Sequence, residues 1–126
     1  MNKIILTIGL AFISVMAFSQ DFDKITSAFG NGNVSELVPL LAATVDISID
    51  DEVLKLGRSD AEARLRTFFL NHSPSSMKVV HKGVSKNDVH YMISALQTND
   101  ATFRVTVYIH KNGQEYLIQS LEIEKE

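Results

Sequence analysis

"TFRVTVYIHKNGQEYLIQSLEIE", residues 102–124, contains the strongest hairpin signal in the chain. Apolar and polar side chains alternate on both sides of the pair Asn112-Gly113, and such alternation is typical of strands with one buried face. Asn-Gly is the strongest short-range signal for a two-residue turn between antiparallel strands. We therefore predict a β-hairpin whose strands cover residues 102–110 and 115–124.

Two further β-runs precede this hairpin. "MKVVHKG" (residues 77–83) and "VHYMISALQ" (residues 89–97) are rich in β-branched and apolar residues, and turn residues separate the runs. The turn pairs are Asn87-Asp88 and Asn99-Asp100. The two runs and the hairpin together predict a four-stranded antiparallel meander over the second half of the chain.

The residues before the meander carry helical patterns. The apolar spacing of "DFDKITSAF" predicts a first helix over residues 21–29, and "GNGN" (residues 30–33) ends it. A second helix is predicted in "SELVPLLAA", with Ser35 as its N-cap. Pro39 then takes the fourth helical position, where its missing N–H has no intrahelical partner to lose.

A strand and a third helix complete the first half. Apolar and polar residues alternate strictly in "TVDISID" (residues 44–50), which predicts a strand with one solvent-exposed face. "DDE" then turns the chain. The third helix begins at "SDAE", a capping box in which Ser59 reaches forward and Glu62 reaches back. Its apolar stripe is Leu65, Phe68 and Phe69, and Pro74 ends it. Helices gathered early and antiparallel strands late indicate an α+β fold.

The first twenty residues, "MNKIILTIGLAFISVMAFSQ", follow the plan of a secretory signal. One cation, Lys3, precedes an apolar run from Ile4 to Phe18, and small residues come next. We predict a signal peptide over residues 1–19, cut after Ser19 or Gln20, and an exported protein, periplasmic or secreted. The alternative is a membrane anchor, but the run is shorter than the roughly 20 apolar residues that usually span a bilayer.

Composition narrows the classes of function. The chain has no cysteine, which leaves neither disulfides nor a thioether-linked lipid. Without Lys3, 15 acidic residues face 11 basic ones, so the mature net charge is -4. This mild acidity favours neither nucleic acid nor membrane insertion of the mature chain. Residues 20–126 suffice for one small folded domain.

Counting outward from the turn pairs assigns each strand residue to a face, because directly paired residues share one. The count sets His81 opposite Ser94, Leu96 opposite Phe103, Met92 opposite Val107, His90 opposite Ile109, and Ile109 opposite Tyr116. The face expected under the helices carries Met77, Val79, His81, His90, Met92, Ser94, Leu96, Phe103, Val105, Val107, Ile109, Tyr116 and Ile118. The other face carries Tyr91, Ile93, Ala95, Arg104, Thr106, Tyr108, Leu117, Gln119 and Leu121.

The two histidines of "HKGVSKNDVHY" do not form a metal site in this register. His90 lies four residues along the strand from the partner of His81, or about 13 Å away at roughly 3.4 Å per residue. Two imidazoles on one zinc ion each need a bond of about 2.0 to 2.1 Å. We predict no metal and no cofactor.

The order of elements, two helices, a strand pair, a capped helix and a long meander, resembles the cone-shaped nuclear transport factor 2-like fold. That fold is also called SnoaL-like or ketosteroid-isomerase-like. The resemblance covers residues 21–126. The passages "AFGNGNVSELVPLL", "HKGVSKNDVHYMISALQT" and "FRVTVYIHKNG" resemble a family of small exported bacterial proteins of unknown function with that fold. These motifs specify helix ends, turns and strand faces, and they carry no chemistry.

The resemblance implies a pocket between the helices and the concave side of the sheet. The polar groups expected there, as candidate pocket residues, are His81, His90, Ser94 and Ser120. The resemblance also implies dimerisation through the opposite sheet face, where the candidate dimer or partner residues are Tyr91, Arg104, Thr106, Tyr108 and Gln119; ordinary sheet surface is an equal interpretation. Asp46 is the strand carboxylate nearest to an isomerase pattern, yet its alternation with Val45 and Ile47 predicts a solvent-facing side chain.

Three functional interpretations follow. The favoured one is an exported noncatalytic module that binds a small apolar or carbonyl ligand or acts as an accessory protein. The alternative is a small cofactor-free isomerase or dehydratase with His81 or His90 as general base, since an imidazole titrates near neutral pH. The third is a purely structural role in the cell envelope. No Gly-rich phosphate loop and no nucleophile elbow are present in the sequence.

Overall fold

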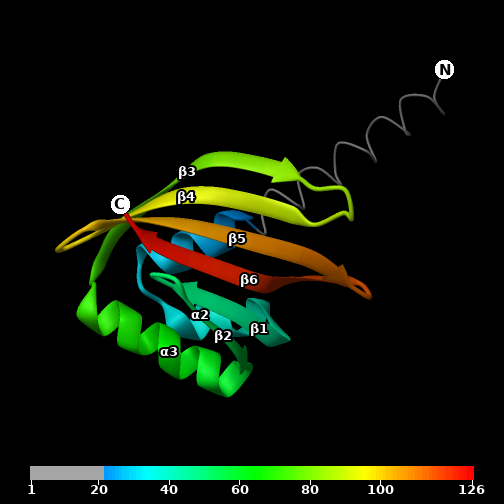
Figure 1. Cartoon of the computed structure of the whole chain (residues 1–126), viewed down its shortest axis with the longest axis horizontal. Helices are drawn as coiled ribbons and strands as arrows, with labels where there is room; N and C mark the ends of the chain where they lie inside the picture. Colours follow the sequence, from blue (N-terminus) through cyan, green and yellow to red (C-terminus); the bar gives the residue numbers. More distant parts are fainter. Residues whose placement is uncertain (1–21) are drawn as a thin grey trace.

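The structure is a computed structural model that describes residues 22–126. The predicted signal peptide, residues 1–19, lies outside the described residues. A helical segment over residues 22–30 comes first. The elements that follow are α2 (Val34–Leu37), the 3-10 helix η1 (Val38–Leu40), β1 (Leu41–Ile49), β2 (Glu52–Gly57), α3 (Arg58–Asn71), β3 (Pro74–Val84), β4 (His90–Thr98), β5 (Thr102–Asn112) and β6 (Glu115–Lys125) (Figure 1). Within the described residues, no helix combines the length and the apolar character that a membrane crossing needs.

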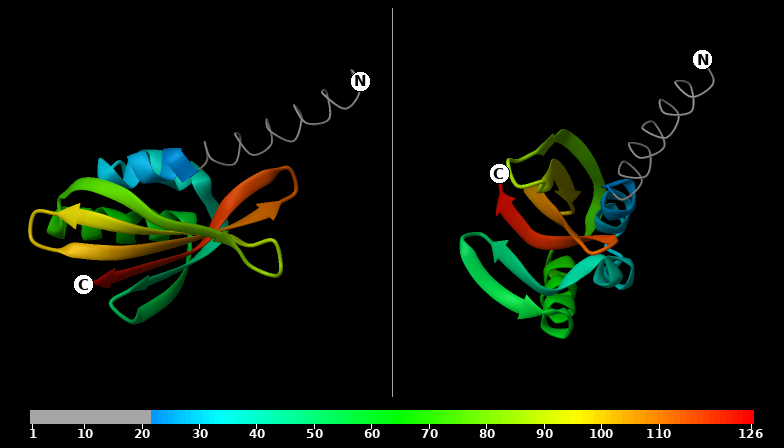
Figure 2. Two further views of the ribbon diagram at one scale, coloured as in Figure 1. Left: turned by 90° about the horizontal axis from the view of Figure 1, so that it is seen from above. Right: turned by 90° about the vertical axis from the view of Figure 1, so that its right-hand side faces the viewer.

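The six strands form one curved sheet in the order β2-β1-β6-β5-β4-β3, which confirms the α+β class. Neighbouring strands are antiparallel except β1 and β6, which are parallel. Asp50 fastens this parallel pair: its N–H donates to the Ile123 carbonyl at 2.9 Å, and its carboxylate accepts from the Lys125 N–H at 3.0 Å. Figure 2 shows the helical segment 22–30 and α2 on one side of the curved sheet.

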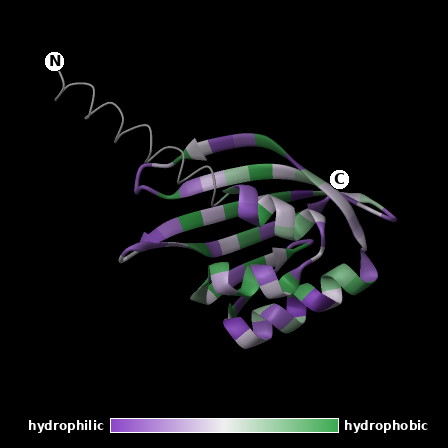
Figure 3. Ribbon diagram, turned by 180° about the vertical axis from the view of Figure 1, so that it is seen from behind, coloured by the Kyte–Doolittle hydropathy of each residue, from purple (hydrophilic) through white to green (hydrophobic). Residues whose placement is uncertain are grey.

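The core lies between the helices and one face of the sheet, called the inner face here. On β4 and β5 this face carries Met92, Ser94, Leu96, Phe103, Val105, Val107 and Ile109, all buried. Phe68 of α3 meets Phe103 edge-to-face at 5.1 Å between ring centroids, and Phe69 meets Phe29 at 5.8 Å. Each such pair contributes about 0.5 to 1.5 kcal/mol beyond its area burial. Polar residues alternate with these apolar ones along the strands (Figure 3).

The β4–β5 hairpin has the predicted register. Leu96 pairs with Phe103, Met92 with Val107, and His90 with Ile109. Exposure alternates along β4 in step with this pairing, since Met92, Ser94 and Leu96 are buried, whereas Tyr91, Ile93 and Ala95 are half-buried. The outer face of the hairpin therefore carries the predicted residues, which are Tyr91, Ile93, Ala95, Arg104, Thr106 and Tyr108.

The predicted register between β3 and β4 is wrong. Val79, not His81, pairs with Ser94, and His81 pairs with Ile93 of the outer face. The Ser85 N–H donates to the Val89 carbonyl at 2.9 Å, so a longer connection replaces the two-residue turn and shifts the register by one residue. That one-residue shift places the β3 residues next to the connection on the face opposite to the one predicted. A bulge at Val80 adds a second shift, so the β3 residues before it lie on their predicted faces. His81 consequently lies on the outer face.

The predicted register between β5 and β6 is also wrong. Gly113, with a φ of +67°, is the first loop residue of the turn, and Asn112 still pairs with Glu115. Positive φ suits glycine, and this turn pairs Ile109 with Ile118 instead of Tyr116. This shift of two residues leaves the faces as predicted, and an irregularity at Gln119 then exchanges them for the residues that follow. Ser120 therefore pairs with Tyr108 on the outer face, whereas Leu121, predicted to face outward, is fully buried.

The second helix is shorter than predicted and begins earlier. Its N-cap is Asn33, whose side chain accepts from the Glu36 N–H at 3.2 Å, and not Ser35. The α-helical turn ends at Leu37, and Pro39 stands in the first turn of η1, where a missing N–H costs nothing. The chain enters β1 at Leu41, which is fully buried.

The predicted capping box of the third helix is wrong, although the helix itself and its apolar stripe are confirmed. The N-cap is Gly57, so Ser59 lies inside the first turn. Arg58 donates to the Leu41 carbonyl at 3.0 Å, a tertiary contact that fixes where the helix begins. Glu62 pairs with Arg66 at 2.9 Å one turn later, as residues four apart on a helix do.

Ser94→Ala is expected to raise the free energy of unfolding by about 1 kcal/mol, because the buried Ser94 hydroxyl has no hydrogen-bond partner among the described residues. Thermal denaturation followed by circular dichroism measures the change, as a midpoint roughly 4–8 °C higher. The matched control is Ser120→Ala on the outer face, which should stay within about 0.5 kcal/mol. A loss of stability in Ser94→Ala would show that the hydroxyl is satisfied, for example by internal water.

Candidate functional site

The four predicted pocket residues do not come together. Ser94 is 1% exposed and sits in the core. His90 is half-buried on the inner face at the start of β4, where its ring lies 6.0 Å from the ring of Tyr116. His81 and Ser120 lie on the outer face. The predicted inner grouping of these four side chains is therefore wrong, because two registers differ from the predicted ones.

The outer face instead carries a pocket of about 340 Å³, called the outer-face pocket here. Its lining residues come from β4, β5, β6 and the β3–β4 connection, and they are Ser85, Tyr91, Ile93, Arg104, Thr106, Tyr108 and Glu122. Four of the five predicted dimer or partner residues, Tyr91, Arg104, Thr106 and Tyr108, are among them. Gln119, the fifth, does not line the pocket and is exposed at the irregularity of β6.

The strand ladders set the positions of these side chains. Tyr91 pairs with Tyr108, and Ile93 pairs with Thr106. Thr106 in turn pairs with Glu122 on β6. Directly paired residues point to the same side of a sheet, so two adjacent rows of side chains meet here. Thr106 is only 7% exposed and forms part of the floor, which is unusual for a residue on a face opposite the core.

Tyr91 is held in place by β3. Its ring lies across Gly83, whose missing side chain makes room for it: a Cβ there would come within 2.4 Å of the ring carbon that bears the hydroxyl. The hydroxyl also lies 3.3 Å from Nε2 of His81. The register set by the longer β3–β4 connection brings His81 to this face, and the bulge at Val80 returns the residues before it to the inner face. Two residues of β3 therefore fix the orientation of one wall of the pocket.

Tyr108 forms the neighbouring wall. The centroids of the Tyr91 and Tyr108 rings are 6.4 Å apart, and the rings are inclined by 42°. Burial raises the pKa of the Tyr108 hydroxyl above its usual value of 10.0, and the negative charge of Glu122 and the neighbouring Tyr91 raise the pKa further. Tyr108 is therefore protonated at neutral pH, and its hydroxyl can donate a hydrogen bond.

Two of the charges around the pocket cancel. The Arg104 guanidinium donates to the Glu124 carboxylate at 2.7 Å, and both side chains are substantially exposed. Such a surface pair contributes little to stability, but it holds the Arg104 charge at the rim. Within residues 22–126 Glu122 has no ion pair. Asp46, opposite Ser120, is half-buried on the same face.

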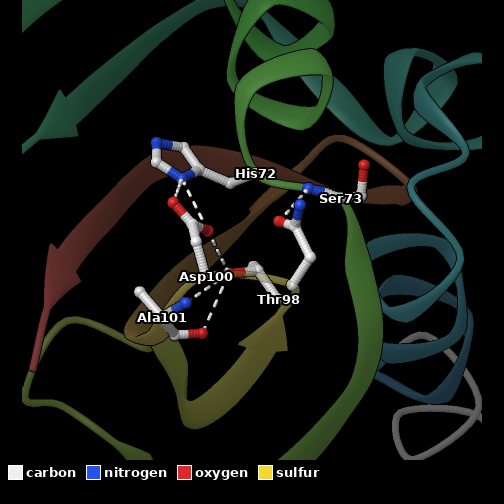
Figure 4. A network of polar contacts seen from close by, with 6 residues as sticks. His72, Ser73, Thr98, Asp100 and Ala101 are labelled. Atoms are coloured by element: carbon white, nitrogen blue, oxygen red, sulfur yellow. Dashed lines mark hydrogen bonds and ion pairs between the residues drawn. The ribbon is translucent and has the colours of Figure 1, made fainter.

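A second polar cluster joins α3 to the turn between β4 and β5 (Figure 4). Nδ1 of His72 lies 2.9 Å and 3.1 Å from the two carboxylate oxygens of Asp100, and Thr98 donates to the same carboxylate at 2.9 Å. The His72 ring packs against Phe68 and Phe103 at 5.0 and 4.9 Å. The sequence offers no signal for this pair, because 28 positions separate its two members. The cluster fastens the end of α3 to the sheet.

Asp100→Asn is expected to destabilise the protein at neutral pH and to have little effect in acid. Hydrogen bonds from His72 and then Thr98 lower the pKa of the Asp100 carboxyl below its usual 3.8. Because the Asp100 pKa is lower in the folded state than in the unfolded state, ionised Asp100 stabilises the fold fully at pH values above the unfolded-state pKa. This stabilisation is lost as the pH falls through the lowered folded-state pKa. Urea denaturation of both proteins between pH 7 and pH 3 measures the difference, which should narrow as the pH falls.

Asp88→Asn is the control for this series, since Asp88 is exposed in the β3–β4 connection and asparagine tolerates its positive φ. Its difference from the parent protein should not change with pH. A gap between Asp100→Asn and the parent that stays constant from pH 7 to pH 3 would contradict the assignment.

Other hollows are larger but carry less chemistry. One of about 450 Å³ lies between α3 and the loop before α2, and one of about 510 Å³ is lined by Lys24, Ser35, Glu36, Pro39 and Leu40. Neither combines paired aromatic rings with a carboxylate. Among the described residues, no three His, Asp or Glu side chains converge so that they could hold a metal ion.

The fold that carries this site is nuclear transport factor 2-like. The crystal structure of a nuclear transport factor 2-like protein of unknown function from Silicibacter pomeroyi DSS-3 superposes with a TM-score of 0.66 at 12% identity, covering 92% of this chain and 98% of that chain. Identity at this level shows the fold alone.

Closer relatives identify the family. The crystal structure of a DUF4783 family protein from Bacteroides uniformis ATCC 8492 is 30% identical with a TM-score of 0.78, covering 82% of this chain and 95% of that chain. A second DUF4783 family protein, from Bacteroides fragilis YCH46, is 30% identical with a TM-score of 0.77, covering 82% and 96%. The model of the domain of unknown function DUF4783 matches residues 22–124, and the chain belongs to this family. A search of curated proteins finds no match.

Proposed function

We propose that this protein is an exported noncatalytic binding module that takes a small ligand in the outer-face pocket. The observation that carries the proposal is the pocket itself. Its volume of about 340 Å³ lies in the range of small-molecule sites, and it combines aromatic walls with a few polar groups. The sequence predicts an apolar or carbonyl ligand on the inner face, where Ser94 is instead surrounded by core side chains.

The rigidity of the pocket supports binding. Its walls stand on β4, β5 and β6. The β4–β5 pairing has no irregularity between Tyr91 and the partner of Arg104, and the β5–β6 pairing has none between Arg104 and the partner of Glu122. Sites built on strands hold their geometry better than sites on loops. Tyr91 is held further by its contact with Gly83 and by His81. A ligand would therefore meet a preformed surface and would lose little free energy in ordering it.

The openness of the pocket favours binding over catalysis. Arg104 and Ser85 at its rim are exposed, whereas Thr106 at its floor is buried. Acid–base catalysis gains most where closure excludes water from the reacting groups. The isomerase or dehydratase hypothesis relied on a histidine base in an inner pocket. Of its two candidate bases, His81 is instead exposed on the outer face beside the Tyr91 hydroxyl, where it positions the ring. His90 is half-buried on the inner face with its ring 6.0 Å from the ring of Tyr116, and it does not line the outer-face pocket.

The proposal includes export to the periplasm or the exterior. Its support is the sequence of residues 1–19, in which one cation precedes a long apolar run that ends in small residues. A ligand from outside the cytoplasm would reach the outer-face pocket without crossing the inner membrane.

The binding proposal is tested by nuclear magnetic resonance with the purified ¹⁵N-labelled protein. A panel of small cationic, anionic and neutral compounds is titrated, and at least one is expected to shift the amide signals of Tyr91 and Thr106 but not that of Ser94. Gly83→Ala should weaken this binding about tenfold, or by about 1.4 kcal/mol, because the new methyl group displaces the Tyr91 ring. Leu70→Ala, far along α3, is the matched control.

Two outcomes would overturn the binding proposal. One is a panel in which no compound shifts the outer-face signals. The other is a set of outer-face shifts that appear on concentrating the protein alone, which would assign this face to a second copy of the chain, as in the predicted homodimer.

Export is tested by expressing the tagged full chain in a bacterial host and sequencing the N-terminus of the fractionated product. The mature chain is expected outside the cytoplasm with Gln20 or Asp21 as its first residue. Leu10→Arg should block export, because a charge interrupts the apolar run. Lys24→Arg, beyond the cleavage site, should leave export unchanged. An uncleaved parent chain in the cytoplasm would refute this part of the proposal.

A further inference from the structure

We propose that the outer-face pocket selects organic ammonium cations, which lie against the rings of Tyr91 and Tyr108 while the Glu122 carboxylate balances their charge. This inference rests on the proposed function and adds the chemical class of the ligand.

The two tyrosine rings suit a cation by their geometry. A cation is attracted to an aromatic face when it lies within about 6 Å of the ring centroid. The Tyr91 and Tyr108 centroids are 6.4 Å apart and their planes are inclined by 42°. One point above the pair can therefore lie within that limit of both centroids. Since the rings come from directly paired residues of β4 and β5, their spacing is set by the backbone.

The charge around the pocket has the matching sign. Arg104 is neutralised by Glu124 at 2.7 Å, which leaves Glu122 as the net charge among the lining residues. Asp46 adds a second carboxylate on the same face, one strand further along the sheet. Two lysines also face outward, Lys55 opposite Asp46 on β2 and Lys78 opposite Ala95 on β3. Neither lysine lines the pocket.

The raised pKa of the Tyr108 hydroxyl reflects the electrostatic potential in the pocket. Burial raises the pKa of its hydroxyl, and the Glu122 charge raises the pKa further. Both effects disfavour a negative charge at this position, and the second one favours a positive charge. The floor of Thr106 and Ile93 is buried or half-buried, so the interaction is screened less than on an open surface. Methylated ammonium groups are the ligands that aromatic walls with an acidic neighbour recognise best, because their apolar methyl groups pack against the rings.

Three probes of the same shape test the inference: choline, its neutral carbon analogue 3,3-dimethylbutan-1-ol, and the anion 3,3-dimethylbutanoate. Each is titrated into the ¹⁵N-labelled protein, and the shifts of the Tyr91 and Thr106 amides give the dissociation constants. Choline is expected to bind at least about tenfold more tightly than the alcohol, and the anion is expected not to bind.

Matched variants separate the ring from the charge. Tyr108→Leu should weaken choline binding about tenfold or more, and Tyr108→Phe should restore most of it because the aromatic face returns. Glu122→Gln should weaken choline several-fold and leave the affinity for the alcohol unchanged. Glu115→Gln, an exposed acid near the Gly113 turn, is the control and should change neither affinity.

The outcomes distinguish this inference from the proposed function. Equal affinities for choline and the alcohol, or stronger binding of the anion, would overturn the cation inference while the pocket remained a binding site. The cation inference would also be overturned if none of the three probes bound while other compounds of the panel shifted the Tyr91 and Thr106 amide signals. If no compound shifted the outer-face amide signals, both the cation inference and the proposed function would be overturned.

Discussion

The register of the β4–β5 ladder sets the positions of both the core side chains and the outer-face side chains. Leu96 against Phe103 and Met92 against Val107 place one row of apolar side chains under the helices. The same pairing necessarily sends Tyr91, Thr106 and Tyr108 to the opposite side, because successive residues of a strand alternate. One set of hydrogen bonds therefore builds the core and the floor of the outer-face pocket together. A change of register by one residue would destroy both.

Irregularities on either side of this ladder decide which other side chains reach the pocket. The longer β3–β4 connection sets a register that places His81 on the outer face, where it supports Tyr91, and the bulge at Val80 keeps Val79 on the inner face. The irregularity at Gln119 carries Glu122 outward beside Tyr108 while Leu121 enters the core. Bulges are recurrent devices for re-aiming side chains near sites. Without the longer connection and the irregularity at Gln119, the pocket would lack its carboxylate and the support of one wall.

Family membership and the functional proposal rest on different observations. The match over residues 22–124 and the two Bacteroides structures establish the family, whose description assigns no function. A shared fold carries many unrelated functions, so function has to be argued from a site. Here that argument uses the aromatic pair, the neutralised Arg104, and Glu122, which has no ion pair within residues 22–126. The His72–Asp100 cluster has the chemistry of a dyad, but its packing against Phe68 and Phe103 gives it a structural role.

Local alternation, turn residues and helical spacing in the sequence are enough to predict the α+β class, the β4–β5 register and the apolar stripe of Leu65, Phe68 and Phe69. Four of the five outer-face candidates line the pocket for the same reason. No local pattern predicts the parallel β1–β6 pairing, the positions of His81 and Ser120, or the N-caps at Asn33 and Gly57. Each depends on contacts between distant segments or on a one-residue slip, and a slip leaves the local pattern unchanged while it reverses the faces.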